Sequence, residues 1–201
     1  VDRSLLPTGR HLETEDLAAL MRACGEDRTP VGARDAAIVA LAYAAGLRRN
    51  ELASLQRQDL HKEDSTMVLR IVDREGEERL AYINNGALRA LEAWLQIRGE
   101  VEGALFWRGR RGGHLAKNKG LSGQAIRDIV VRRAEEAQIG HVTPNDLRRT
   151  FMSDLLAAGV GPNTVAAMAG HESAQPTKRY DPGEEAAKRH NATRLKVPYY
   201  D

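Results

Sequence analysis

Two short motifs place arginine side chains beside the start of a predicted helix. In the motif GLRRNEL, one helix stops at the glycine and another begins within three residues, so Arg48 lies at a corner from which its side chain can project into a cleft. Glu51 lies one turn further on and is placed to hold that guanidinium. In the motif TPNDLRRT, Asn145 and Arg148 are three residues apart and share one face near the positive end of a helix. Forked guanidinium donors of this kind suit the oxygens of a phosphate group.

A third motif, AGHESAQPTKRY, adds a histidine and a tyrosine after another predicted helix. His171 directly follows a glycine at the helix stop, and Tyr180 comes nine residues later, beyond Pro176. A histidine can donate a hydrogen bond to an oxyanion, and a tyrosine phenol can act as a nucleophile. Taken singly, these features also fit surface arginines, a capping asparagine, a turn histidine and a packed tyrosine. The three motifs together are more specific than any one of them.

The hydrophobic pattern indicates which elements position these residues. It predicts mostly helix with one small β-hairpin, which makes the fold class mainly α within an α+β domain. The hairpin combines β-rich segments over 67–72 and 79–83, joined by a polar turn. Thr14 is the expected cap of the first helix, and Thr143 or Asn145 of the sixth. The predicted helices cover residues 14–25, 32–45, 50–55, 87–97, 123–137, 145–158, 162–169 and 184–195.

Composition excludes several other classes of protein. The chain has 201 residues, a net charge of +2 and one cysteine, Cys24, so it has no internal disulfide framework and no cysteine-based zinc site. It carries no apolar run of the roughly 20 residues that a membrane helix needs, and no phosphate-loop, dinucleotide-binding or His-Glu-x-x-His motif. Its histidines are scattered without the spacing of metal ligands. We therefore expect a protein of a reducing, cytoplasmic compartment, with no metal and no cofactor.

Positive charge is concentrated in one stretch of the sequence. Residues 108–119 contain three arginines, two lysines and one histidine but no acid. Such a run is typical of a surface that docks on phosphates, although a solvated loop with spare arginines is the alternative. The residues that we expect to contact DNA are Arg108, Arg110, Arg111, Lys117, Lys119 and, beside the second arginine motif, Arg149.

The strings GLRRNEL, TPNDLRRT and AGHESAQPTKRY, in this order, resemble the catalytic domain of the tyrosine recombinases, the phage-integrase and Xer family. The resemblance extends from about residue 11 to residue 180. It implies that Arg48 and Arg148 are the two catalytic arginines, that His171 is the later histidine of the site, and that Tyr180 is the nucleophile. The sequence departs from the family pattern at two positions, in the second arginine motif and at the hairpin turn.

The first departure is Asn145, which stands where the family usually has histidine and which keeps a neutral hydrogen-bond donor. The second concerns the catalytic lysine that the family carries at the hairpin turn. The closest match there is Arg74, and a guanidinium yields a proton poorly. The nucleophile and the two arginines that bind the phosphate are therefore expected to be intact. The sequence does not identify the group that gives a proton to the leaving oxygen.

The resemblance also implies the reaction and the partners. The tyrosine attacks a DNA phosphate and forms a 3′-phosphotyrosyl link, two arginines and a histidine stabilise the charge, and another strand's 5′-hydroxyl reseals the break without ATP, metal or cofactor. The partner is double-stranded DNA at the nucleoid. The active form is a tetramer on DNA, or a monomer as an isolated fragment. Two alternatives remain: a DNA-binding module that has lost turnover, and relaxation of the type IB topoisomerase kind.

The expected domain organisation has three parts. Residues 1–11 are interpreted as a linker from an N-terminal DNA-binding domain, residues 12–182 as the catalytic domain, and residues 183–201 as a C-terminal helix and tail. In the family such a tail often docks on a neighbouring subunit. The alternative is a helix that packs on its own domain.

Overall fold

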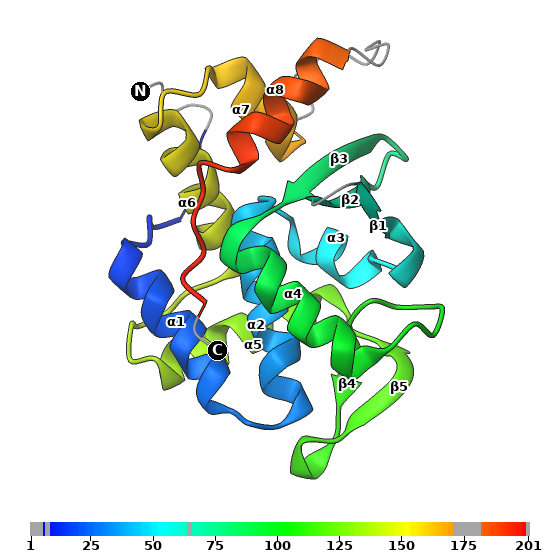
Figure 1. Ribbon diagram of the computed structural model, residues 1–201. Helices are drawn as coiled ribbons and strands as arrows, with labels where there is room; N and C mark the ends of the chain where they lie inside the picture. The colour runs from blue at the N-terminus through cyan, green and yellow to red at the C-terminus, as the bar shows by residue number, and fades with distance from the viewer. Residues whose placement is uncertain (1–5, 7–8, 64–65, 171–181, 200–201) are drawn as a thin grey trace.

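The structure is a computed structural model that describes residue 6 and residues 9–63, 66–170 and 182–199. His171 and Tyr180 lie outside the described residues, as do residues 1–5. The remaining chain forms α-helices and two small antiparallel sheets (Figure 1). The helices are α1 (Thr14–Glu26), α2 (Pro30–Ala44), α3 (Arg49–Ser54), α4 (Asn85–Arg98), α5 (Gly123–Glu136), α6 (Pro144–Ala157), α7 (Pro162–Ala169) and α8 (Pro182–Ala192).

Helix α2 forms the centre of the hydrophobic core. Nearly every residue in it is buried, and it packs against α1, α4 and α6. A helix that is apolar all round needs such neighbours on every side. The predicted helices are confirmed with small shifts at their ends. Helix α1 is one of these, because Glu13 rather than Thr14 occupies its cap position.

A buried ion network fastens α2 to α5. The carboxylate of Asp35 is fully buried and accepts hydrogen bonds from its neighbour Arg34 and from Arg133, which also pairs with Asp27 at the end of α1. Because each of these buried charges has a partner, the network holds three helices in one arrangement.

The predicted hairpin is present and is extended by a third strand. Strands β1 (Leu60–Glu63), β2 (Thr66–Val72) and β3 (Glu78–Ile83) form an antiparallel sheet in that order, with Leu69 opposite both Leu60 and Ala81. The β2–β3 pair could be predicted because two segments rich in β-branched and apolar residues flank a polar turn. Strand β1 is short and mostly polar, so its sequence gives no comparable signal.

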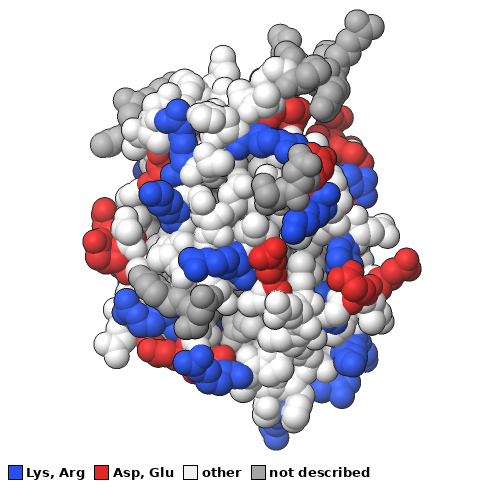
Figure 2. All heavy atoms as spheres, in the orientation of Figure 1, with Lys and Arg blue, Asp and Glu red and all other residues white. Residues whose placement is uncertain are grey.

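The basic run folds as a second hairpin instead of an irregular loop. Strands β4 (Trp107–Gly109) and β5 (Leu115–Gly120) pair antiparallel, and Trp107 and Ala116 point into the protein while the basic side chains stay exposed. Figure 2 shows basic side chains over the whole of the face in view, including the lower right, where Figure 1 places β4 and β5.

The C-terminal segment packs on its own chain. Helix α8 lies against β3 and α7, where Tyr82 donates a hydrogen bond to Glu185 at 2.8 Å. Beyond the helix, Leu195 and Val197 are buried, and the backbone runs so close to α4 that a Cβ added to Gly86 would lie 1.9 Å from the Val197 carbonyl oxygen. For residues 182–199 the structure thus shows the alternative arrangement, a helix and tail packed on their own domain.

The beginning of the described chain is bonded to α6. The backbone N–H of Arg10 donates to Asp146 at 2.7 Å, and that of Leu12 donates to the Thr150 hydroxyl at 2.9 Å. The same Asp146 accepts hydrogen bonds from Thr143 at the cap of α6.

Within the described residues, no helix is long and apolar enough to cross a membrane.

Candidate active site

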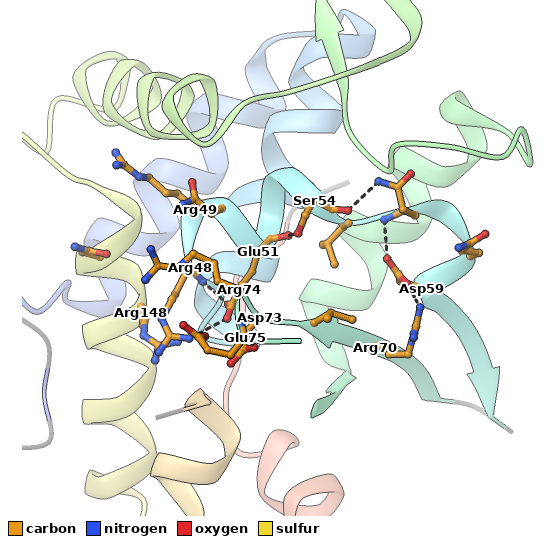
Figure 3. A pocket seen from close by; sticks show the side chains of 16 residues that line it. Arg48, Arg49, Glu51, Ser54, Asp59, Arg70, Asp73, Arg74, Glu75 and Arg148 are labelled. Atoms are coloured by element: carbon orange, nitrogen blue, oxygen red, sulfur yellow. Dashed lines mark hydrogen bonds and ion pairs between the residues drawn. The ribbon is translucent and has the colours of Figure 1, made fainter. Parts of the chain in front are cut away.

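A pocket of about 800 Å³ opens between α3, the β2–β3 turn and the start of α6. Figure 3 shows Arg48, Arg74 and Arg148 together at one end of it, and Asp59 with Arg70 at the other. Arg48 and Arg148, which are 100 residues apart in the sequence, therefore meet in one place. The side chains that line the pocket are Arg48, Arg49, Asn50, Glu51, Ser54, Leu55, Gln56, Gln58, Asp59, Arg70, Val72, Asp73, Arg74, Glu75, Asn145 and Arg148.

Arg48 occupies the cap position of α3, at the corner that follows the end of α2. Its backbone N–H donates to Glu51 at 2.7 Å, which satisfies one of the free donors at the helix start. Its guanidinium donates to Glu51 at 3.0 Å and to the carbonyl of Gly170 at 2.8 Å. The side chain is still 38% exposed, so part of the guanidinium remains open to the pocket.

Arg148 reaches the same pocket from the second turn of α6 and is only 4% exposed. It donates a hydrogen bond to the carbonyl of Gly46, the residue that ends the turn after α2. Burial, followed by the charges of Arg48 and Arg79, lowers the pKa of Arg148 to about 9. The guanidinium is therefore charged at neutral pH, but in surroundings that favour an anion beside it.

Glu51 is the carboxylate at the centre of these arginines. It is 5% exposed, and each of its oxygens accepts two hydrogen bonds, one from Arg48 and one from Arg79. Burial would raise its pKa, but the hydrogen bonds and charge of Arg79, followed by those of Arg48, hold the pKa below its usual value. Within the group formed by Glu51, Arg48, Arg79 and Arg148, one negative charge thus faces three positive ones. The pocket lining as a whole has five arginines and four carboxylates, so it carries one more positive than negative charge.

Arg48, Arg79, Arg148 and Glu51 form a charged cluster. Sequence reasoning missed one of its members, Arg79. It lies on β3, 28 residues from its partner Glu51, in a segment interpreted only as a strand. One available signal was a lone cation in a strand whose following residues are apolar. That signal identifies no partner, because the pairing depends on how the hairpin packs on α3.

The other predicted site residues divide into two groups. Arg74 and Asn145 are exposed and line the pocket, Arg74 from the β2–β3 turn and Asn145 from the first turn of α6. The turn is fixed by Asp73, whose side chain accepts the backbone N–H groups of Glu75 and Glu77. The expected DNA-contacting residues lie outside this pocket: Arg108, Arg110, Arg111, Lys117 and Lys119 on the β4–β5 hairpin, and Arg149, half-buried, on α6.

The described part of the chain holds no group of three or more His, Cys, Asp or Glu side chains arranged as metal ligands. The pocket is lined by five guanidinium groups, several amides and four carboxylates, of which Glu51 is fully bonded to Arg48 and Arg79. Such a donor set recognises an oxyanion, and its forked donors fit the non-bridging oxygens of a phosphate.

The chain belongs to the phage integrase family, whose sequence profile matches residues 10–185. Two similar curated proteins are both tyrosine recombinases XerC. The protein from Corynebacterium efficiens is 36% identical over 150 residues, which cover 73% of this chain and 46% of that protein. The protein from Pelobacter propionicus is 29% identical over 173 residues, which cover 85% and 54%. The chain thus spans about half the length of the curated relatives it matches.

Solved structures confirm the fold that was expected from the sequence. The XerA recombinase superposes with a TM-score of 0.69 at 22% identity, over 92% of this chain and 66% of the other. The catalytic core of lambda integrase gives a TM-score of 0.59 at 15% identity, over 81% of this chain and 96% of the other.

Proposed function

We propose that this chain cuts and rejoins DNA strands as a site-specific tyrosine recombinase, through a covalent 3′-phosphotyrosyl intermediate. The observation that carries the proposal is the convergence of Arg48 and Arg148, 100 residues apart, on one pocket with an excess of positive charge. Membership of the phage integrase family and similarity to tyrosine recombinases XerC support it.

The proposed reaction needs a nucleophile, charge stabilisation and proton transfer. We assign the nucleophile to Tyr180, whose phenolic oxygen attacks the phosphorus while the bond to the 5′ oxygen breaks. The phenol gives up one proton and the leaving 5′ oxygen takes up one, so the step is balanced. A 5′-hydroxyl from another strand reverses these bond changes and reseals the DNA without an external energy source.

Charge stabilisation is the part that the described residues supply. As phosphorus becomes five-coordinate, negative charge grows on its non-bridging oxygens, and fixed donors stabilise that charge best when they need no rearrangement. Arg148 is held by Gly46, and Arg48 is held by Glu51 and Gly170. We assign His171 and Asn145 as further donors, and Arg74 as the positive charge on the side of the hairpin turn.

The proposed partner is double-stranded DNA, bound by a tetramer when recombination occurs and, in an isolated fragment, by a monomer. The exposed basic residues of the β4–β5 hairpin would contact backbone phosphates, which positions the duplex without reading its sequence. A protein with this function would act at the nucleoid in the cytoplasm.

The test is covalent capture on DNA. A pool of duplexes with a nick and a randomised segment around it is incubated with the chain, and the products are separated on a denaturing gel. We expect an adduct whose DNA can be sequenced and whose peptide carries the modification on Tyr180. Tyr180→Phe, which removes one oxygen, is the matched control and should bind DNA without forming the adduct. DNA binding with no adduct from the unchanged chain, or an adduct on another tyrosine, would contradict the proposal.

A further inference from the structure

The structure links three residues that were not connected in the sequence: Arg79 on β3, Glu51 on α3 and Gly170 at the end of α7. Arg79 is 9% exposed and, although it belongs to the charged cluster, is absent from the pocket lining. It therefore has no direct access to a bound phosphate. Any effect of Arg79 on a bound phosphate must therefore act through the groups that Arg79 contacts.

The first of these groups is the Glu51 carboxylate. Two guanidinium nitrogens of Arg79 donate to the two Glu51 oxygens, each at 2.9 Å, in the forked arrangement that fixes a carboxylate in its plane. One Arg48 nitrogen then bonds to the outer side of the same carboxylate at 3.0 Å. Because Arg79 occupies the fork, Arg48 is limited to a single side-chain contact with Glu51.

The second group is the end of α7. Gly170 has a left-handed backbone, with φ of 66°, and a Cβ at this position would lie 2.9 Å from one Arg79 nitrogen. The Arg79 side chain also donates to the carbonyl of Met168 at 3.3 Å. The carbonyl of Gly170 in turn accepts the other Arg48 nitrogen at 2.8 Å. Arg79 thus packs on the same residue that anchors the far side of Arg48.

We propose that Arg79 is a positioning residue, which holds the Arg48 guanidinium open to the pocket by occupying Glu51 and supporting Gly170. Without Arg79, the buried Glu51 carboxylate keeps only Arg48 as a cationic partner. Both terminal guanidinium nitrogens of Arg48 then bond to Glu51. The hydrogen bond to the Gly170 carbonyl is lost, and the guanidinium moves away from the position where a phosphate oxygen would bind. This inference rests on the proposed function for its catalytic consequence, but its structural consequence is independent of that function.

The kinetic test compares single-turnover adduct formation on the captured nicked duplex at saturating DNA. Misplacement of a reacting group by about 1 Å can cost about 10²-fold in rate, and we expect a loss of that order for Arg79→Met with DNA affinity near that of the unchanged chain. Arg79→Lys keeps the charge but not the fork, and should be slowed nearly as much. In the Glu51→Gln background, adding Arg79→Met should lower the rate of adduct formation little further, because Arg79 acts through the Glu51 carboxylate, which that background lacks.

Arg133→Met is the matched control for loss of a buried ion pair, since Arg133 bonds Asp27 and Asp35 away from the pocket. Measured per folded molecule, it should form the adduct at the normal rate. An equal rate for Arg79→Met and the unchanged chain, or a rate for Arg79→Lys equal to that of the unchanged chain, would overturn the inference.

A crystal structure of the Arg79→Met variant decides the matter even if the unchanged chain forms no adduct, an outcome that would count against the proposed function alone. The inference predicts that both terminal nitrogens of Arg48 contact Glu51 and that the bond to the Gly170 carbonyl is lost. Arg48 still bonded to Gly170 in that variant would overturn it.

Discussion

At the scale of single residues, the Glu51 carboxylate bonds both Arg48 and Arg79. A carboxylate whose pKa is lower in the folded than in the unfolded chain adds stability that is fully present above the unfolded pKa and is lost as pH falls through the folded pKa. The pKa of Glu51 is lowered in this way from an ordinary value of 4.5, against the effect of burial, by Arg79 and Arg48.

Glu51→Gln is therefore expected to lower the free energy of unfolding at pH 7 by about 3–5 kcal/mol, because it leaves buried guanidinium groups without their counter-charge. The difference from the unchanged chain should shrink as pH falls below 4.5. Urea unfolding at pH 7 and at lower pH measures both. A difference that stays constant with pH would show that the charge of Glu51 is not its source.

Arg148 provides a second test at the same scale. An anion placed between Arg48 and Arg148 offsets their mutual repulsion, so sulfate should stabilise the folded chain by about 1.4 kcal/mol at a concentration tenfold above its Kd. Thermal unfolding in sulfate and in chloride of equal ionic strength measures the effect. Sulfate also stabilises proteins in general because it is excluded from their surface.

Two variants separate the specific from the general effect of sulfate. Arg148→Met should lose the specific part, whereas Arg127→Met, which changes a partly exposed arginine on α5, should retain it. A sulfate response that is the same in Arg148→Met as in the unchanged chain would contradict an anion site between the two arginines.

At the scale of elements, the C-terminal segment contributes to the fold of its own chain. Leu195 is buried, so Leu195→Ala should lower the free energy of unfolding by about 2–3 kcal/mol. Its neighbour Lys196 is exposed, and Lys196→Ala should change stability by no more than about 0.5 kcal/mol. Denaturant unfolding at several protein concentrations tests this. Stability that rises with protein concentration, and no effect of Leu195→Ala at low concentration, would indicate that the tail docks on another copy instead.

Elements also show what the sequence could and could not predict. A long apolar run that stops at a glycine identifies α2, and two β-rich segments joined by a polar turn identify the β2–β3 hairpin. Cap and stop residues place Arg48 and Arg148 at helix starts. Strands β1, β4 and β5 are three to six residues long and carry many polar side chains, so they lack such an apolar signal. The Arg79–Glu51 pair is missed for a different reason. It arises from the packing of a hairpin on a helix, which no local pattern records.

At the scale of the whole molecule, the near-neutral total charge conceals a surface that is locally basic. Binding of the chain to duplex DNA should be strongly salt-dependent, because each neutralised phosphate releases counterions. Changing Arg110, Arg111 and Lys117 to alanine together should flatten the slope of log K against log salt by about one unit per lost contact. Fluorescence anisotropy over a salt series measures the slope.

The matched control for that triple variant keeps the charges and exchanges their carriers, with Arg110→Lys, Arg111→Lys and Lys117→Arg. Its slope should equal that of the unchanged chain. If the alanine variant also keeps the original slope, the β4–β5 hairpin does not contact the phosphates, and its basic side chains are only solvated.

The hydrogen bonds between residues 10–12 and α6 have a mechanical consequence. Arg10 and Leu12 are bonded to Asp146 and Thr150, which lie on either side of Arg148 on the same helix. A pull applied to the chain ahead of residue 10 is therefore transmitted to the helix that carries this arginine through these two hydrogen bonds, in addition to the core packing of Leu12. Tension on residues 10–12, or its release, would therefore shift α6 and with it the position of Arg148 in the pocket.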